Sequence, residues 1–225
     1  ELRTPLTSVR GYAIALQSGV AADSDARERA LATIEAESAR MGRLVDELLD
    51  LSRLESGQSR LELAPVLVEE EFNRTLERFA PVARDRQVTL RAIPAGMSTV
   101  IADADRLAQA LGNLVDNALR HTDAGGSVTL WSTEHDGVVR MSVIDTGSGM
   151  DPETASRAFD RFQRGSEHVG AGFGLGLSIV REIVSTHRGT VEIESEIGAG
   201  TTVTLVLPAT EVLLSEKKGA SDVRS

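Results

Sequence analysis

The first 56 residues constrain the fold most, because they hold two amphipathic helical patterns separated by a short break. In residues 1–20, apolar side chains recur every three or four positions, which is the seam of a helix that packs against other helices. Residues 25–56 repeat the pattern with a wider apolar face, and Asp23 or Ser24 in the break can cap the second helix. The sequence therefore predicts a helical hairpin.

Such a hairpin cannot bury all of its apolar surface alone. The simplest solution is that two hairpins pair into a dimeric four-helix bundle. The alternative is a monomeric hairpin that packs against the domain after it. The pattern by itself leaves both open.

Composition excludes several classes of function. The 225 residues carry a net charge of -10 without a basic stripe, so we expect no nucleic-acid partner. The absence of cysteine excludes disulfides, thiolate catalysis and cysteine-ligated metals. No apolar run approaches the roughly 20 residues that span a bilayer, so no transmembrane segment is expected in this chain.

The rest of the chain mixes helical and strand patterns. Helices are expected at 69–85, 104–121, 152–159 and 174–187, and strands at 87–93, 98–102, 127–133, 137–145, 189–194 and 201–207. Together they predict an α/β sandwich, in which helices cover a mixed sheet. The whole chain is then α+β: a hairpin at 1–57, a linker at 58–66, the sandwich at 67–208 and a disordered tail at 209–225.

A pair of asparagines lies in the expected 104–121 helix. Asn113 and Asn117 are four residues apart, so they share one helix face. Amide oxygens are hard, neutral ligands that suit Mg²⁺, which also retains waters and phosphate oxygens. The alternative is a solvated polar face without a ligand.

Two glycine-rich turns follow. Asp145 ends an apolar strand and begins the sequence DTGSG, where Gly147 and Gly149 let the backbone approach a ligand closely. Its carboxylate can accept a hydrogen bond from an adenine amine, although a plain β-turn has the same sequence. The second turn, Gly170–Leu177 (GAGFGLGL), precedes an apolar helix whose free N–H groups can bind phosphate. A glycine hinge without a ligand is the alternative.

The segment between these turns, residues 150–169, is polar. It contains Phe159 and Phe162 next to Arg161 and Arg164, which indicates a lid that the phenylalanines anchor and from which an arginine reaches a phosphate. The alternative is a surface loop over a small satellite core. The later turn Gly198–Thr201 is by itself only a hairpin turn.

In chain order, these motifs resemble the nucleotide-binding half of bacterial two-component sensor histidine kinases. That half belongs to the GHKL fold group, with gyrase, the MutL mismatch-repair protein and the heat-shock chaperone ATPases. Residues 1–6 (ELRTPL) resemble the family's histidine box immediately after its phosphoacceptor histidine. The resemblance covers roughly residues 1–208.

The resemblance implies that the sandwich binds ATP with Mg²⁺. The residues implied to contact the nucleotide are Asn113, Asn117, Arg120, His121, Asp145, Gly147, Gly149, Phe159, Phe162, Gly172, Gly174, Gly176 and Leu177. Among them, Asn117 would be the Mg²⁺ ligand and Asp145 would read adenine.

The resemblance also implies the reaction. The γ-phosphoryl group of ATP would pass to a histidine and then to an aspartate in the receiver domain of a response regulator. Glu1 would accept a proton from the acceptor imidazole, and Thr4 matches the position tied to dephosphorylation of the regulator. The protein would act as a homodimer through its hairpin, as the cytoplasmic part of a parent anchored in the cell membrane.

One departure from the family affects activity. None of the four histidines (His121, His135, His168 and His187) lies in a histidine-box context, so we expect a chain truncated just after the acceptor. It would bind Mg-ATP and dimerise without phosphorylating itself. Two alternatives stay open: a non-catalytic, nucleotide-gated dimeric scaffold (a pseudokinase), and an ATPase or Ser/Thr kinase of the same fold group, whose members lack this hairpin.

Overall fold

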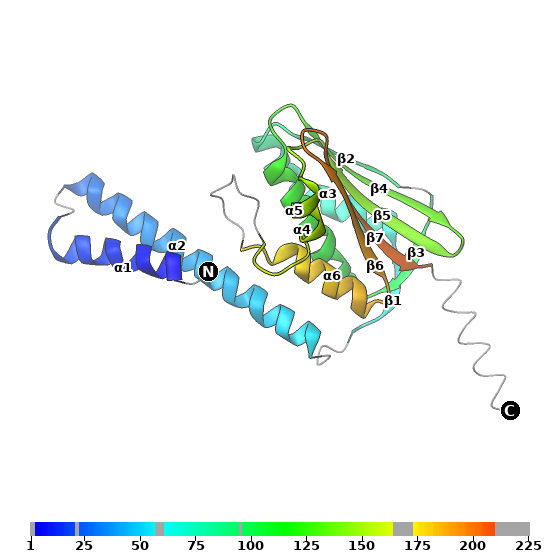
Figure 1. Ribbon diagram of the computed structural model, residues 1–225, viewed down its shortest axis with the longest axis horizontal. Helices are drawn as coiled ribbons and strands as arrows, with labels where there is room; N and C mark the ends of the chain where they lie inside the picture. Colours follow the sequence, from blue (N-terminus) through cyan, green and yellow to red (C-terminus); the bar gives the residue numbers. More distant parts are fainter. Residues whose placement is uncertain (1–2, 21–22, 57–60, 95, 164–172, 210–225) are drawn as a thin grey trace.

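The computed structural model describes residues 3–20, 23–56, 61–94, 96–163 and 173–209. They form a helical hairpin that projects from a domain in which helices cover a sheet (Figure 1). Glu1, Gly170, Gly172, His168, Arg164 and the tail beyond Ala209 lie outside the described residues.

The hairpin consists of α1 (Arg3–Gln17) and the much longer α2 (Ser24–Glu55), which lie side by side. Asp23 is the N-cap of α2, because its side chain accepts a hydrogen bond of 2.6 Å from the backbone N–H of Ala26. Both helices predicted from the apolar spacing are confirmed. In the described part of the chain, no helix is long and apolar enough to cross a membrane.

The main sheet has five strands in the order β2-β4-β5-β7-β6. Their bounds are Thr89–Ile93 (β2), Ser127–His135 (β4), Val138–Asp145 (β5), Thr190–Glu196 (β6) and Gly200–Pro208 (β7). β2 runs parallel to β4 and the other neighbours are antiparallel, so the sheet is mixed, as predicted.

A second, two-stranded sheet joins β1 (Ala64–Leu67) to β3 (Thr99–Ala102). The sequence did not predict β1, and it begins inside the segment expected to be a linker. Four residues are too short for an alternating pattern to be visible, and β1 is defined by its pairing with β3.

Three helices cover one face of the main sheet: α3 (Val68–Asp85), α4 (Ala104–His121) and α6 (Gly176–Thr186) (Figure 1). Their apolar faces bury Phe72, Leu111 and Ile179 against a layer of strand residues that includes Leu130 and Leu205. The short α5 (Pro152–Ser156) ends three residues before the end of the helix predicted at 152–159. α6 begins two residues after the start of the helix predicted at 174–187.

The opposite face of the sheet is more open. Trp131 in β4 is 38% exposed and pairs with Ile93 of the edge strand β2, which is also exposed. The one tryptophan of the chain therefore lies in this sheet.

The hairpin also packs on the domain, through α2 and α6. Leu44, Leu51 and Leu54 of α2 are almost completely buried and belong to the same apolar cluster as the domain core. Polar contacts accompany them: the amide of Gln109 in α4 donates to the Asp50 carboxylate at 3.1 Å. α2 therefore packs on the domain that follows, as one of the two alternatives requires, while the dimeric four-helix bundle stays a prediction.

Candidate functional site

Two of the predicted motifs meet where α4 passes the start of α6. The side-chain amide of Asn113 donates to the carbonyl oxygen of Gly176 at 3.4 Å. A Cβ atom added to Gly176 would lie 3.9 Å from the Asn113 side chain, at ordinary van der Waals distance, so the start of α6 and the Asn113 side chain are direct neighbours. The first turn of α6, with its unpaired N–H groups, therefore faces the asparagine-bearing side of α4.

Asp145 lies at the end of β5, 8% exposed. Its Oδ1 accepts hydrogen bonds from the backbone N–H groups of Gly147 (2.9 Å) and Thr201 (3.2 Å). Both bonds end on one oxygen, which leaves Oδ2 able to accept from a ligand amine. Burial raises the pKa of the Asp145 carboxyl, although the two backbone hydrogen bonds and the charge of His121 act in the opposite direction.

The glycines after Asp145 are required by close backbone packing. A Cβ atom on Gly147 would collide with the carbonyl oxygen of His121, to which Ser148 donates a hydrogen bond of 3.1 Å. Gly149 has a φ of +64° and lies against the carbonyl oxygen of Glu196. The turn is therefore fixed between the end of α4 and the β6–β7 connection.

The turn at 198–201 takes part in the site, which its sequence alone did not predict. Gly200 has a φ of +98°, and a Cβ atom there would collide with the Asp145 carbonyl oxygen. The register of β5 with β7 places Thr201 opposite Asp145 and directs its N–H to the carboxylate. The signal in the sequence was Gly198–Thr201, but its role depends on a strand pairing between distant residues.

The remaining residues of α4 differ in their surroundings. Asn117 is half-buried one turn after Asn113, on the same face. Arg120 is held by an ion pair with Asp116 at 2.5 Å, and its side chain is 34% exposed. The carbonyl of His121 accepts the Ser148 N–H, so the backbone of His121 supports the Asp145 turn.

The donors available to a metal are few. Within the described residues, no group of three or more His, Cys, Asp or Glu side chains could hold a metal ion. A magnesium ion at this site would depend on the Asn117 amide together with oxygens from a bound ligand and water. Mg²⁺ is commonly bound in this way, so the residues fit the ion only when a phosphate ligand is present.

The predicted lid is described up to Gln163. The Phe162 N–H donates to the carbonyl oxygen of Gly174 at 2.9 Å, and Gly174 has a φ of +70° that suits glycine. Phe159 packs against the core as predicted, but Phe162 is 43% exposed and does not anchor the segment. Phe162 has a left-handed φ of 61°, and it is Phe173, beyond the lid, that is buried.

Other predicted residues lie elsewhere. Leu177 is in the first turn of α6 and packs partly buried against the core. Thr4 is exposed in the first turn of α1, on the hairpin. Phe173 is covered by the hairpin as well, because the Arg40 guanidinium of α2 lies 5.0 Å from the centre of its ring.

Two family models match the chain. The model described as "Histidine kinase-, DNA gyrase B-, and HSP90-like ATPase" matches residues 102–211, and the "His Kinase A (phospho-acceptor) domain" matches residues 1–57. Sensor protein DivL of Caulobacter vibrioides is 37% identical over 212 residues, which is 94% of this chain and 27% of DivL. The chain thus spans only about a quarter of that relative.

Solved structures agree in fold. ShkA in complex with AMPPNP is 31% identical with a TM-score of 0.73, and the match covers 83% of this chain and 39% of ShkA. The mycobacterial sensor histidine kinase MprB is 31% identical with a TM-score of 0.58, and the match covers 65% of this chain and 97% of MprB.

Proposed function

This chain belongs to the sensor histidine kinase family, and from that premise we propose that it is the catalytic core of a protein-histidine kinase in two-component signalling. The domain would bind Mg-ATP, and the γ-phosphoryl group would pass to a histidine and then to an aspartate of a response regulator. The observation that carries the proposal is the buried Asp145 carboxylate, held between two glycine turns with one oxygen available.

Asp145 would recognise adenine. Its Oδ1 is fixed by Gly147 and Thr201, so Oδ2 has a defined direction and can accept from the exocyclic amine of the base. Because the carboxylate is buried, a hydrogen bond from a ligand donor contributes more binding free energy there than it would in water. This geometry favours adenine over guanine, which presents a carbonyl oxygen at the corresponding position.

The triphosphate would lie between α4 and α6. The start of α6 supplies N–H groups and the positive end of a helix dipole, and Gly174 and Gly176 let the backbone approach the phosphates. Asn117 would bind Mg²⁺, with Asn113 oriented beside it by its hydrogen bond to Gly176. The ion would neutralise charge on the phosphates, while positioning by the protein supplies most of the catalysis.

The acceptor histidine is not among residues 1–57, which contain no histidine. We therefore expect the chain as printed to bind Mg-ATP without labelling itself at the hairpin. A nucleotide-gated scaffold without kinase activity would use the same nucleotide site and is the second candidate. Adding a histidine directly before Glu1 distinguishes them: acid-labile, ATP-dependent labelling of that variant supports the kinase, and its absence while ATP is bound supports the scaffold.

We also propose that the chain works as a homodimer through its hairpin and forms the cytoplasmic part of a membrane-anchored protein. Exposed apolar side chains on both helices, among them Leu6, Ile14 and Leu31, support the dimer. Family membership supports the anchor.

The nucleotide proposal is tested by titration calorimetry with Mg-ATP and Mg-GTP. We expect ATP to bind in the millimolar range or tighter, and GTP to bind roughly tenfold or more weakly, because its base leaves Oδ2 without a donor. No heat of binding with millimolar ATP, or equal affinity for the two nucleotides, would contradict the assignment of Asp145.

A further inference from the structure

The first turn of α4 is held by a segment from outside the domain core. Asp103 is the N-cap of this helix, and its Oδ1 accepts from the backbone N–H of Arg106 at 3.1 Å. Its second oxygen, Oδ2, accepts from the backbone N–H of Glu62 at 3.0 Å. Glu62 lies between α2 and β1, so one carboxylate both caps α4 and holds the connection from the hairpin.

The same residue is tied to the end of α6. The Asp103 backbone N–H donates to Nε2 of His187 at 2.9 Å, and Nδ1 of this ring lies 2.7 Å from the Ile183 carbonyl oxygen. His187 is the C-cap of α6 and is 6% exposed. Since Nε2 accepts, the ring proton of the neutral form is on Nδ1, where it donates to Ile183.

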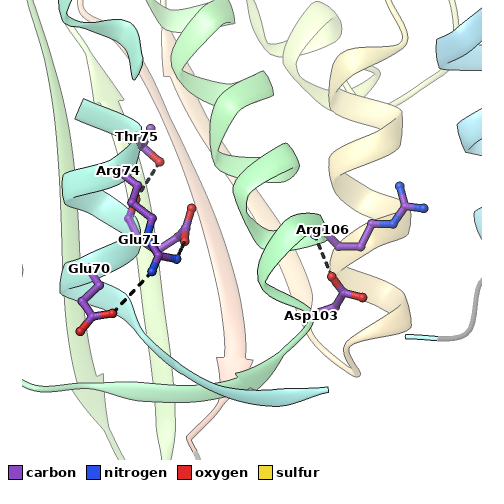
Figure 2. A network of polar contacts seen from close by, with 6 residues as sticks. All are labelled: Glu70, Glu71, Arg74, Thr75, Asp103 and Arg106. Carbon is purple, nitrogen blue, oxygen red and sulfur yellow. Dashed lines mark hydrogen bonds and ion pairs between the residues drawn. The ribbon is translucent and has the colours of Figure 1, made fainter. Parts of the chain in front are cut away.

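The hairpin reaches this turn directly as well. Asp50 of α2 lies 3.8 Å from the Arg106 guanidinium and accepts from the Gln109 amide at 3.1 Å. Gln109 also accepts from Arg106 at 2.9 Å. Figure 2 shows Asp103 and Arg106 at the beginning of α4, beside the ribbon of α6.

We propose that Asp103 couples the hairpin to the two helices of the candidate nucleotide site, α4 and α6. His187 is the positioning residue that holds the beginning of α4 and the end of α6 together. α4 carries Asn113 and Asn117, and α6 begins at Gly176, so the far ends of both helices meet at Asp103. A displacement of the segment at Glu62 is then transmitted to both helices through one residue: to α4 through the Asp103 carboxylate, and to α6 through the Asp103 backbone N–H and His187. The coupling is a property of the fold and does not depend on the proposed function.

The test replaces Asp103 by asparagine. The amide oxygen of Asp103→Asn can still cap α4, because asparagine is as good a cap as aspartate. Its NH2 group then faces the Glu62 N–H, so two donors meet and the bond to the connecting segment is lost. Asp105→Asn is the matched control, since Asp105 is exposed in the same turn and loses the same charge.

Amide hydrogen exchange, followed residue by residue by NMR without nucleotide, gives the first result. In Asp103→Asn we expect the Glu62 amide to exchange roughly tenfold faster while the Arg106 amide is unchanged. In His187→Phe the Asp103 amide should exchange faster, and His187→Gln, which retains an acceptor, should restore part of its protection.

A distance measurement gives the second result. The chain has no cysteine, so spin labels can be placed at Glu28→Cys in α2 and Glu134→Cys in β4, both exposed positions. We expect Asp103→Asn to broaden the distance distribution and Asp105→Asn to leave it unchanged. Identical distributions and identical Glu62 exchange in both variants would overturn the proposal, as would an equal rise in exchange along all of α4.

Discussion

Asp145 combines a fixed orientation with a buried carboxylate. Replacing it by asparagine leaves the amide oxygen to accept from Gly147 and Thr201. The NH2 group then occupies the position of Oδ2 and directs a donor at the adenine amine. We expect Asp145→Asn to weaken ATP binding by roughly 10- to 100-fold, measured by calorimetry against the exposed control Asp136→Asn.

The pH dependence of that loss follows from the raised pKa of Asp145. Only the ionised carboxylate accepts on both oxygens, and a proton on Oδ2 would turn this atom into a donor that faces the adenine amine, so ATP affinity is full above the pKa of Asp145 and falls as the pH drops through it. Because burial raises this pKa above the ordinary value of 3.8, the fall begins at a higher pH than for an exposed aspartate. The ratio of wild-type to Asp145→Asn affinity removes the ionisation of ATP itself; a ratio constant down to pH 4 would contradict the role.

A comparison of Gly149 with Gly96 distinguishes the free-energy cost of a positive φ from the cost of a steric clash. Both have a positive φ, but a Cβ atom would meet the Glu196 carbonyl at Gly149 and open space at Gly96. Gly96→Ala should cost about 1 kcal/mol of unfolding free energy, and Gly149→Ala roughly 3 kcal/mol or more. Urea unfolding measures both, and equal losses would show that packing around Gly149 is looser than described.

At this scale the sequence pointed to individual residues, but it did not predict which distant residues lie next to them. Asp145 and its glycines could be singled out because strand, carboxylate and turn are contiguous in the sequence, and the role of Asp145 in adenine binding stays a prediction. Thr201 was missed, since its N–H reaches Asp145 only through the β5–β7 register. The sequence also did not predict that Phe162 is exposed while Phe173 is buried. Burial of an aromatic side chain in a loop depends on what packs over it, which for Phe173 includes Arg40 of α2.

Among the elements, the long periodic segments were predicted, but the short ones only in part: the strands β2 and β3 were predicted, whereas β1 was not. The bounds of α4 agree with the predicted 104–121 helix, which has an aspartate cap and a continuous apolar face. β1 was missed and α5 is shorter than expected, because segments of about five residues carry too few positions to define a period.

The contact between α2 and the domain leads to a prediction about Leu51. Its side chain is 3% exposed and belongs to the domain's apolar cluster, although it lies in the hairpin. Leu51→Ala should lower the unfolding free energy by about 2–4 kcal/mol, because it leaves a cavity. Val82→Ala is the control: Val82 is 40% exposed in α3 and should cost less than about 1 kcal/mol. Similar losses in the two variants would mean that α2 leaves the domain in solution.

For the molecule as a whole, the exposed apolar side chains of the hairpin predict association. Leu31 is 59% exposed and Leu49 is 50% exposed on α2, while the domain buries the other side of this helix. Sedimentation equilibrium should give about twice the chain mass of 24.0 kDa. Leu31→Glu should shift the protein toward monomer, whereas Ile197→Glu, at an exposed position of the β6–β7 turn, should not. A monomeric wild type at high concentration would refute the dimer.

The position of Trp131 has a practical consequence. As the chain's one tryptophan, it makes intrinsic fluorescence a local probe of the sheet, whereas helical circular dichroism is dominated by α2 and the other helices. Two melting curves recorded on the same sample will therefore coincide if hairpin and sheet unfold as one cooperative unit, and separate if they do not.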